Sequence, residues 1–359
     1  MKTHQPRGFS ALPKLAAAPA GAAMSALLCA AICLAPAAQA QDKVLNVYSA
    51  RHYQTDEQLY GDFSKQTGVK INRIELGDEP LLERMKSEGD KSPADIVLLV
   101  DATRLFRAQQ EGLFQPVESK VLTERIPAEF RASDNSWFGF SSRARVIVYN
   151  KANVDPKNVQ TYESLADPVN RNKVCTRSGS HPYNLSLFGA MIEHVGLEKT
   201  EAWLKGVVAN QARSPKGGDT DQIKAVASGE CGVALTNTYY WVRLMRSEAP
   251  ADKEVVSKVG MIWPNQATTG AHMNLAGGAV ARHSPNKATA VRFLEYLSSD
   301  QAQTYFANGN NEWPTVMTAE TGNPALESLG RFKADKLPTD RMAARSPDAQ
   351  KLLDNVGYK

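Results

Sequence analysis

GVALTNTYYWVRL (Gly232–Leu244) is an apolar stretch of the sequence that contains two adjacent tyrosines. It becomes polar at Asn237 and Thr238 and then continues into Tyr239 and Tyr240. Its short apolar start favours a β-strand, whereas Asn and Thr are preferred residues at the start of a helix. The pattern therefore predicts a strand, a helix cap and a helix in succession.

The junction between this strand and this helix is a predicted ligand-binding position. In an open α/β sheet, ligands bind beyond the carboxyl ends of the strands, where the amides of a helix N-terminus point at them. Neighbours on a helix point about 100° apart, so an arbitrary Tyr-Tyr pair would place one ring in the core and one at the surface. In the first turn, however, both side chains can reach one point. Tyr239 and Tyr240 are therefore candidate ligands.

The first forty residues have the features of an export signal. They contain Lys2, Arg7 and Lys14, no acidic residue, and an apolar stretch that ends in an Ala-Gln-Ala motif at Ala40. This composition predicts a secretory signal peptide over residues 1–40 that is cleaved after Ala40. No later stretch is apolar enough to span a bilayer, so we expect no stable membrane insertion.

The charge and length of the exported chain limit the class of protein to which it can belong. The whole sequence has a formal net charge of +4, and loss of the leader leaves about +1, which gives no reason to expect a nucleic-acid partner. About 320 residues remain, which is long for one hydrophobic core and favours two α/β lobes.

Cys175 and Cys231 are the two cysteines that follow the leader. An oxidising compartment favours a disulfide between them. The alternative is a thiol metal site, but further ligands at metal spacing are missing from the sequence.

Alternating strand and helix patterns predict parallel βαβ units. Strands are expected at 44–49, 69–76 and 94–100, and helices at 55–66 and 79–87. Two extended segments at 137–140 and 144–149 are expected to cross into a second lobe, and a strand at 273–281 to return the chain to the first. A single helix is expected at 285–305.

Further tyrosines and a histidine occupy similar junctions. The first strand leads into His52 and Tyr53, and a strand at 174–176 leads through a loop to Tyr183. Phenolate oxygen is a hard anionic donor, which suits Fe(III) better than softer divalent ions. A bound cation can remove the phenolic proton, and three or four phenolates leave a near-neutral site with a trivalent ion. We expect reduction of the metal or protonation of the phenolates to release it.

Four motifs, in this order, resemble the ferric-iron-binding periplasmic proteins that serve ABC importers. They are SARHY ending at Tyr53, SSR ending at Arg143, CTRSGSHPYN starting at Cys175, and NTYYWVR starting at Asn237. The resemblance covers essentially the whole exported chain. It implies a periplasmic protein with the type II periplasmic-binding-protein fold, in which two α/β lobes joined by crossover strands enclose a ligand cleft.

In that fold, four segments of the chain would form the lobes. Residues 41–140 and 267–312 would form the N-terminal lobe, and residues 141–266 and 313–359 the C-terminal lobe.

Carried over motif by motif, the resemblance implies five metal ligands for Fe(III): His52, Tyr53, Tyr183, Tyr239 and Tyr240. The histidine binds the ion in some members of the family and does not bind it in others. The tyrosine after it matches the branch that needs no exogenous anion, although a synergistic anion such as carbonate, or citrate, stays open. Fe(II) as the physiological cargo also stays open.

Arg143 and Arg243 match arginines near the metal in the resembling proteins. Arg243 follows Tyr239 by four residues and so lies on the same helical face. Both arginines would offset phenolate charge, and the alternative for each is a surface salt bridge.

Other titratable residues near these motifs have simpler interpretations. His181 is expected to be a loop histidine rather than a ligand. Asp78 and Glu79 lie where some relatives place a carboxylate ligand, which the additional tyrosines make less necessary.

The resemblance implies a monomer that delivers iron to the membrane permease of an ABC importer and its ATPase, and that is not an enzyme. The same fold also binds oxyanions and polyamines, but the clustered phenols argue against both. An exported hydrolase is an alternative of another class. No Gly-x-Ser-x-Gly elbow or His-Glu-x-x-His helix supports it.

Overall fold

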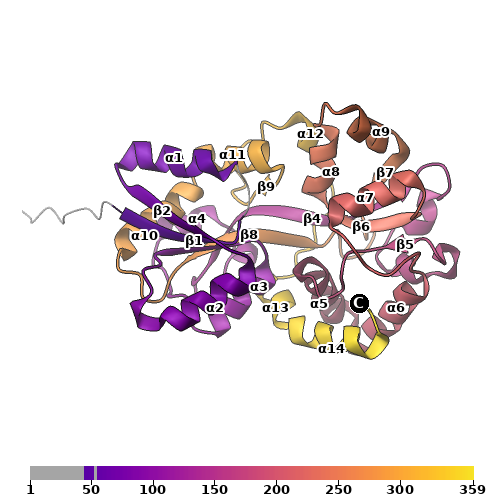
Figure 1. Ribbon diagram of the computed structural model, residues 1–359, viewed down its shortest axis with the longest axis horizontal. Helices are drawn as coiled ribbons and strands as arrows, with labels where there is room; N and C mark the ends of the chain where they lie inside the picture. The colour runs from indigo at the N-terminus through magenta and orange to yellow at the C-terminus, as the bar shows by residue number, and fades with distance from the viewer. Residues whose placement is uncertain (1–43, 52–54) are drawn as a thin grey trace, which may run out of the picture. The chain divides into compact units, whose positions relative to one another are not determined.

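The computed structural model describes residues 44–51 and 55–359 (Figure 1). Two of the predicted ligands, His52 and Tyr53, lie outside the described residues. None of the helices in the described residues combines the length and the hydropathy needed to cross a bilayer.

The strands of the described residues form one mixed sheet, in the order β2-β1-β3-β8-β4-β6-β5, with β7 and β9 paired to β4. Their bounds are β1 Val44–Ser49, β2 Lys70–Glu75, β3 Ile96–Leu99, β4 Phe138–Asn150, β5 Val174–Cys175, β6 Val233–Asn237, β7 Val259–Ile262, β8 Met273–Val280 and β9 Trp313–Pro314. The predicted parallel pairing holds for β1 with β2 and β3, and for β5 with β6. β8 and β4 run antiparallel to their neighbours.

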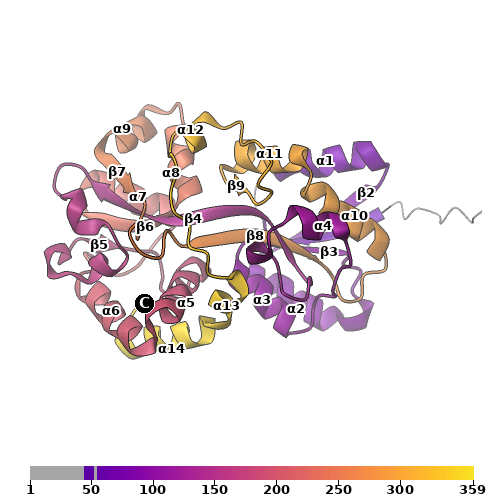
Figure 2. The ribbon, with the colours of Figure 1, turned by 180° about the vertical axis from the view of Figure 1, so that it is seen from behind.

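Fourteen α-helices surround this sheet in the described residues (Figures 1 and 2). Their bounds are α1 Asp56–Thr67, α2 Asp78–Glu88, α3 Ala102–Gln110, α4 Lys120–Arg125, α5 Pro182–Val195, α6 Leu197–Ala209, α7 Asp219–Ser228, α8 Thr238–Met245, α9 Pro250–Lys258, α10 Lys287–Leu297, α11 Asp300–Asn310, α12 Pro324–Glu327, α13 Thr339–Ala344 and α14 Ser346–Val356. Short 3-10 turns lie at Gly89–Lys91, Ala128–Phe130, Pro156–Val159, Glu163–Ala166 and Pro168–Asn170.

β4 is one continuous strand, so the prediction of two separate extended segments was wrong. Its first half, 138–144, pairs with β8, and its second half, 145–149, pairs with β6. The polar Ser-Ser-Arg segment does not interrupt it, because the backbone pairing with β8 continues through Ser141, Ser142 and Arg143. Twelve of its thirteen residues are buried. β4 therefore belongs to both halves of the sheet.

The single helix predicted at 285–305 was also wrong, because the chain breaks between α10 and α11. Ser299 begins α11, and its hydroxyl accepts a hydrogen bond from the amide of Ala302. A serine at this position satisfies an amide that has no partner within the helix.

Separate groups of buried side chains fill the two halves of the sheet. One group packs α1, α10 and α11 against β1 and β3, and includes the edge-on pair of Phe63 and Phe293. Another packs α5, α6 and α14 against the end of β4 and β6, and includes Phe188 and Trp203.

The predicted disulfide is confirmed. The sulfurs of Cys175 and Cys231 are 1.98 Å apart, and both side chains are buried. The bond ties the end of β5 to the residues that lead into β6, and it uses both thiols that the alternative metal site would need.

The double variant Cys175→Ser/Cys231→Ser should lose stability, because the bond closes a loop of 56 residues. The loop-entropy estimate for such a loop is roughly 4 kcal/mol. Urea denaturation of both proteins measures the difference. A reducing agent should destabilise the wild type and leave the variant unchanged, whereas a loss below about 1 kcal/mol would contradict a structural role.

Candidate functional site

The strand-to-helix junction predicted from the opening stretch forms at β6 and α8. β6 ends at Asn237, and α8 begins at Thr238, so Tyr239 and Tyr240 lie in the first turn of the helix. Their ring centroids are 4.2 Å apart. Tyr239 is buried and Tyr240 half-buried, so the two side chains lie together rather than on opposite sides of the helix.

Tyr183 approaches the same point from a different helix. It is the second residue of α5, and its hydroxyl oxygen lies 3.0 Å from that of Tyr239. Two helix N-termini that are 56 residues apart in the sequence therefore place phenol groups in direct contact. Of the five predicted ligands, the structure brings together Tyr183, Tyr239 and Tyr240.

Three guanidinium groups surround the ring of Tyr183. The guanidinium carbons of Arg177, Arg143 and Arg145 lie 5.0, 5.5 and 6.0 Å from its centroid. Cations at this distance are attracted by the aromatic face and leave a positive potential around the hydroxyl. Arg177 and Arg145 were not among the residues predicted for the site.

Arg243 lies over the other two rings. Its guanidinium carbon is 6.0 Å from the centroid of Tyr239 and 5.5 Å from that of Tyr240. The side chain is exposed at the end of α8. The helical spacing therefore placed this arginine correctly beside the tyrosine pair.

Arg143 is buried, so the alternative of a surface salt bridge is wrong for it. Its Nη1 lies 3.8 Å from Oε1 of Glu312, and the hydroxyl of Ser141 donates to the other oxygen of that carboxylate at 2.7 Å. Burial lowers the pKa of Arg143, but Glu312 and the nearby tyrosines act in the opposite direction and raise it overall. The guanidinium therefore stays charged beside the phenols.

Arg145 connects the elements that carry the tyrosines. Its guanidinium donates to Asp219 at 2.6 Å, to the side-chain oxygen of Asn184 at 2.9 Å and to that of Asn237 at 3.1 Å. The amide of Asn237 also donates to Asp219, at 2.7 Å. All four side chains are buried. Together they join β4 to the starts of α5 and α7 and to the junction of β6 with α8.

The loop before α5 is capped by His181. Its Nδ1 accepts from the amide of Tyr183 at 3.3 Å, and the two rings are 4.5 Å apart. Burial, together with Arg177 and neighbouring arginines, lowers the pKa of His181 to about 2. A neutral ring is the form that can accept this hydrogen bond.

The two acidic residues considered as carboxylate ligands begin α2. Glu79 is engaged by Arg104 and, at 2.7 Å, by Arg107. Within the described residues, no three His, Cys, Asp or Glu side chains gather as a metal site. The phenol groups of Tyr183, Tyr239 and Tyr240 are therefore the candidate oxygen donors for a hard cation.

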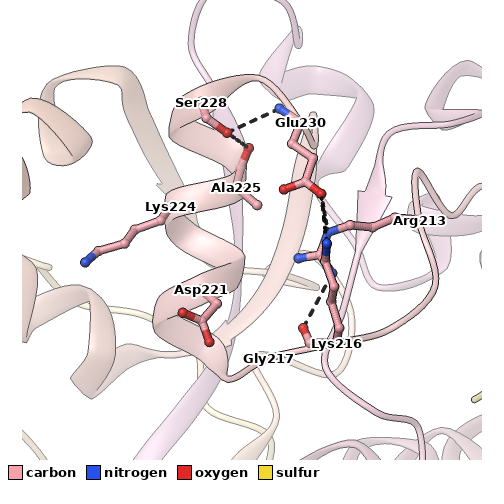
Figure 3. Close-up of a pocket in the computed structure, with 8 residues that line it drawn as sticks. All are labelled: Arg213, Lys216, Gly217, Asp221, Lys224, Ala225, Ser228 and Glu230. Carbon is pink, nitrogen blue, oxygen red and sulfur yellow. Dashed lines mark hydrogen bonds and ion pairs between the residues drawn. The ribbon is translucent and has the colours of Figure 1, made fainter.

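A surface hollow of about 480 Å³ beside α7 contains none of these tyrosines (Figure 3). Figure 3 shows Arg213 directed at Glu230, and the two groups are 3.0 Å apart. Lys216 is 3.5 Å from the same carboxylate. Since this glutamate offsets the basic residues next to it, we assign no ligand to the hollow.

The family model described as bacterial extracellular solute-binding protein matches residues 58–334. The chain belongs to this family.

Relatives of this solute-binding protein share most of their length with it. Iron uptake protein A1 of Synechocystis is 46% identical over 319 residues, which cover 89% of this chain and 88% of the relative. The Fe(3+)-binding periplasmic protein of Serratia marcescens is 26% identical over 335 residues, or 92% and 96% of the two chains.

A solved structure of the Trichodesmium protein IdiA (FutA) in complex with iron and citrate is also similar. It is 48% identical, covers 88% of this chain and 100% of its own, and superposes with a TM-score of 0.84. The predicted resemblance to ferric-iron-binding proteins and the predicted fold class are confirmed.

The variant Asp219→Ala should be strongly destabilised, because it leaves the Arg145 guanidinium buried without its carboxylate. Removing one partner of a buried ion pair costs about 3–5 kcal/mol, and urea denaturation measures it. The matched control is Glu124→Gln, which breaks the exposed pair with Lys120 and should cost less than about 0.5 kcal/mol. Equal losses in both variants would contradict the role of the buried network.

Acid should destabilise the protein partly through His272, which is buried directly before β8. Burial and Arg145 lower the pKa of its side chain to about 3, against the opposing effect of Asp335. The unfolded chain takes up this proton near pH 6.5, so stability falls as the pH drops from 6.5 toward 3, by about 1.4 kcal/mol per unit.

Urea denaturation of the wild type and of His272→Gln between pH 8 and pH 4.5 tests this dependence. The stability difference between the two proteins at pH 8 serves as the baseline. Below pH 6.5 the variant should lose less stability than the wild type, and parallel curves would refute the assignment.

Proposed function

We propose that this chain captures Fe(III) with tyrosine phenolates and delivers it to the permease of an ABC importer. The observation that carries the proposal is the contact of two phenol oxygens at 3.0 Å, with the ring of a third tyrosine 4.2 Å from that of Tyr239 between centroids. Membership of a solute-binding family supports a binding role, and the names of the relatives favour iron as the solute.

The spacing of the phenols suits a single small ion. Neighbouring oxygen ligands at right angles around an ion, each at about 2 Å, are themselves about 3 Å apart. The hydroxyls of Tyr183 and Tyr239 already have this separation. An ion that displaces their protons would replace the hydrogen bond between them with two metal–oxygen bonds.

The surrounding arginines favour a site with several anionic ligands. Arg143 is buried and charged next to Tyr183, and Arg243 covers Tyr239 and Tyr240. Their positive charge offsets that of phenolates, and it also repels a metal ion that lacks enough anionic ligands. We therefore propose that Arg143 and Arg243 support phenolate ligands and do not bind the metal.

We propose that His52 and Tyr53, which follow β1 in the sequence, complete the coordination. In this proposal a synergistic anion, carbonate or citrate, is a further ligand. The Trichodesmium structure, which contains iron and citrate, supports a carboxylate-bearing companion.

Export and delivery follow from the same proposal. We propose cleavage after Ala40 and a monomer in the periplasm, the compartment named for the Serratia relative. Residues 41–140 and 267–312 would move as one lobe, and residues 141–266 and 313–359 as the other. Closure of the lobes on the ion would require only that the closed form coordinates it better than the open form.

The variants Tyr239→Phe and Tyr240→Phe should each weaken Fe(III) binding by about 100-fold or more, because loss of outer-shell partners alone costs 10–100-fold. Competition with a ferric chelator other than citrate measures the affinity. The matched control is Tyr48→Phe, since Tyr48 is a buried tyrosine whose hydroxyl donates to Glu88 at 2.9 Å in the other half of the sheet. Wild-type affinity in both site variants would refute the proposed ligands.

A further inference from the structure

The loop between β5 and α5 carries several groups of the proposed iron site. It runs from Thr176 to His181, and Tyr183 is the second residue of the helix that follows. Arg177 in this loop lies 5.0 Å from the Tyr183 ring, and His181 caps the helix on which that tyrosine sits. Any movement of the loop therefore changes both the position of the phenol and the charge beside it.

Residues far along the chain hold this loop from one side. The hydroxyl of Tyr358 donates to the side-chain oxygen of Thr176 at 2.7 Å, and the amide of Gly179 donates to the carbonyl of Lys359 at 2.7 Å. Burial raises the pKa of Tyr358 to about 12, so the phenol keeps the proton that it donates.

The ring of Tyr358 also fills the space under the loop. It lies 5.6 Å from the ring of Phe188 in α5, between centroids. A Cβ at Gly179 would stand 2.6 Å from the Tyr358 ring and 3.0 Å from Leu353 of α14, so only glycine fits against this surface. The loop backbone therefore packs directly on the aromatic ring.

The other side of the loop is held by α5 itself. The side-chain amide of Asn184 donates to the carbonyls of Arg177 and Ser178 at 3.1 and 2.9 Å. The same residue accepts from Arg145, which links it to the elements that carry Tyr239 and Tyr240. The loop is thus fixed between Tyr358 on one side and the Arg145 network on the other.

We propose that Tyr358 is a positioning residue for the iron site, which acts by holding the loop 176–181 so that Arg177 and Tyr183 keep their places. The contacts on which this role rests are those of Tyr358 with Thr176 and Phe188, and Tyr358 is not among the proposed metal ligands. This inference rests on the proposed function. Residues that orient metal ligands from outside affect metal affinity even though they make no bond to the ion.

The test is a double-mutant cycle with Tyr358→Phe and Thr176→Val, each of which removes one end of the same hydrogen bond. Both single variants should weaken Fe(III) binding by about fivefold to tenfold, since the bond contributes on the order of 1 kcal/mol. The double variant should be no weaker than either single variant, because the interaction is lost only once. The visible absorption band of the iron-bound protein should shift in all three.

Tyr48→Phe is the matched control, since it also deletes a buried tyrosine hydroxyl that donates to a side chain. It should lower the thermal midpoint without changing iron affinity or the band. If Tyr358→Phe behaves in the same way, the residue is only structural and the inference is overturned. Additive losses in the double variant would also overturn it. Absence of Fe(III) binding by the wild type in the same series would instead overturn the proposed function, and this inference with it.

Discussion

The candidate site depends on the ion pair and hydrogen bonds that the buried guanidinium of Arg145 makes. A charge removed from water is tolerated only when its partners satisfy it, and here they are Asp219, Asn184 and Asn237. Asp219 begins α7, Asn184 lies in the first turn of α5, and Asn237 ends β6. Because one rigid planar group bonds all three, the helix starts that carry Tyr183 and Tyr239 cannot move independently.

The strand that carries Arg145 also explains why the site lies where it does. β4 pairs with β8 through residue 144 and with β6 from residue 145, so this arginine stands where the strand passes from one half of the sheet to the other. Arg143 is two residues earlier and therefore on the same face. Both guanidinium groups approach Tyr183 from that face. The crossover strand thus supplies buried positive charge to the place where phenolates are proposed to form.

Local patterns in the sequence predicted much of this arrangement. The strand, cap and helix around Asn237 follow from residue preferences over a few positions, and Arg243 follows from helical spacing. The disulfide followed from the oxidising compartment that the leader predicts and from the two cysteines that follow the leader. The motif resemblance added Arg143 and the ligand set, of which His52 and Tyr53 lie outside the described residues.

The parts that sequence reasoning missed depend on contacts between distant segments. Arg145 was overlooked although it directly precedes the apolar residues Val146, Ile147 and Val148, where a charged side chain indicates a buried partner. Its partner Asp219 is 74 residues away, and no local rule connects the two. The contact between Tyr358 and Thr176 spans 182 residues. The break between α10 and α11 could have been predicted from a local signal that was missed. Ser299 precedes an acidic residue, as residues at helix N-caps commonly do.

The most direct measurement is a visible absorption titration of the metal-stripped protein lacking residues 1–40 with ferric citrate, followed by dithionite. Phenolates bound to Fe(III) give a charge-transfer band, so the account predicts a band that saturates at one equivalent and bleaches on reduction. Iron binding without such a band, or no binding at all, would contradict a tyrosinate site.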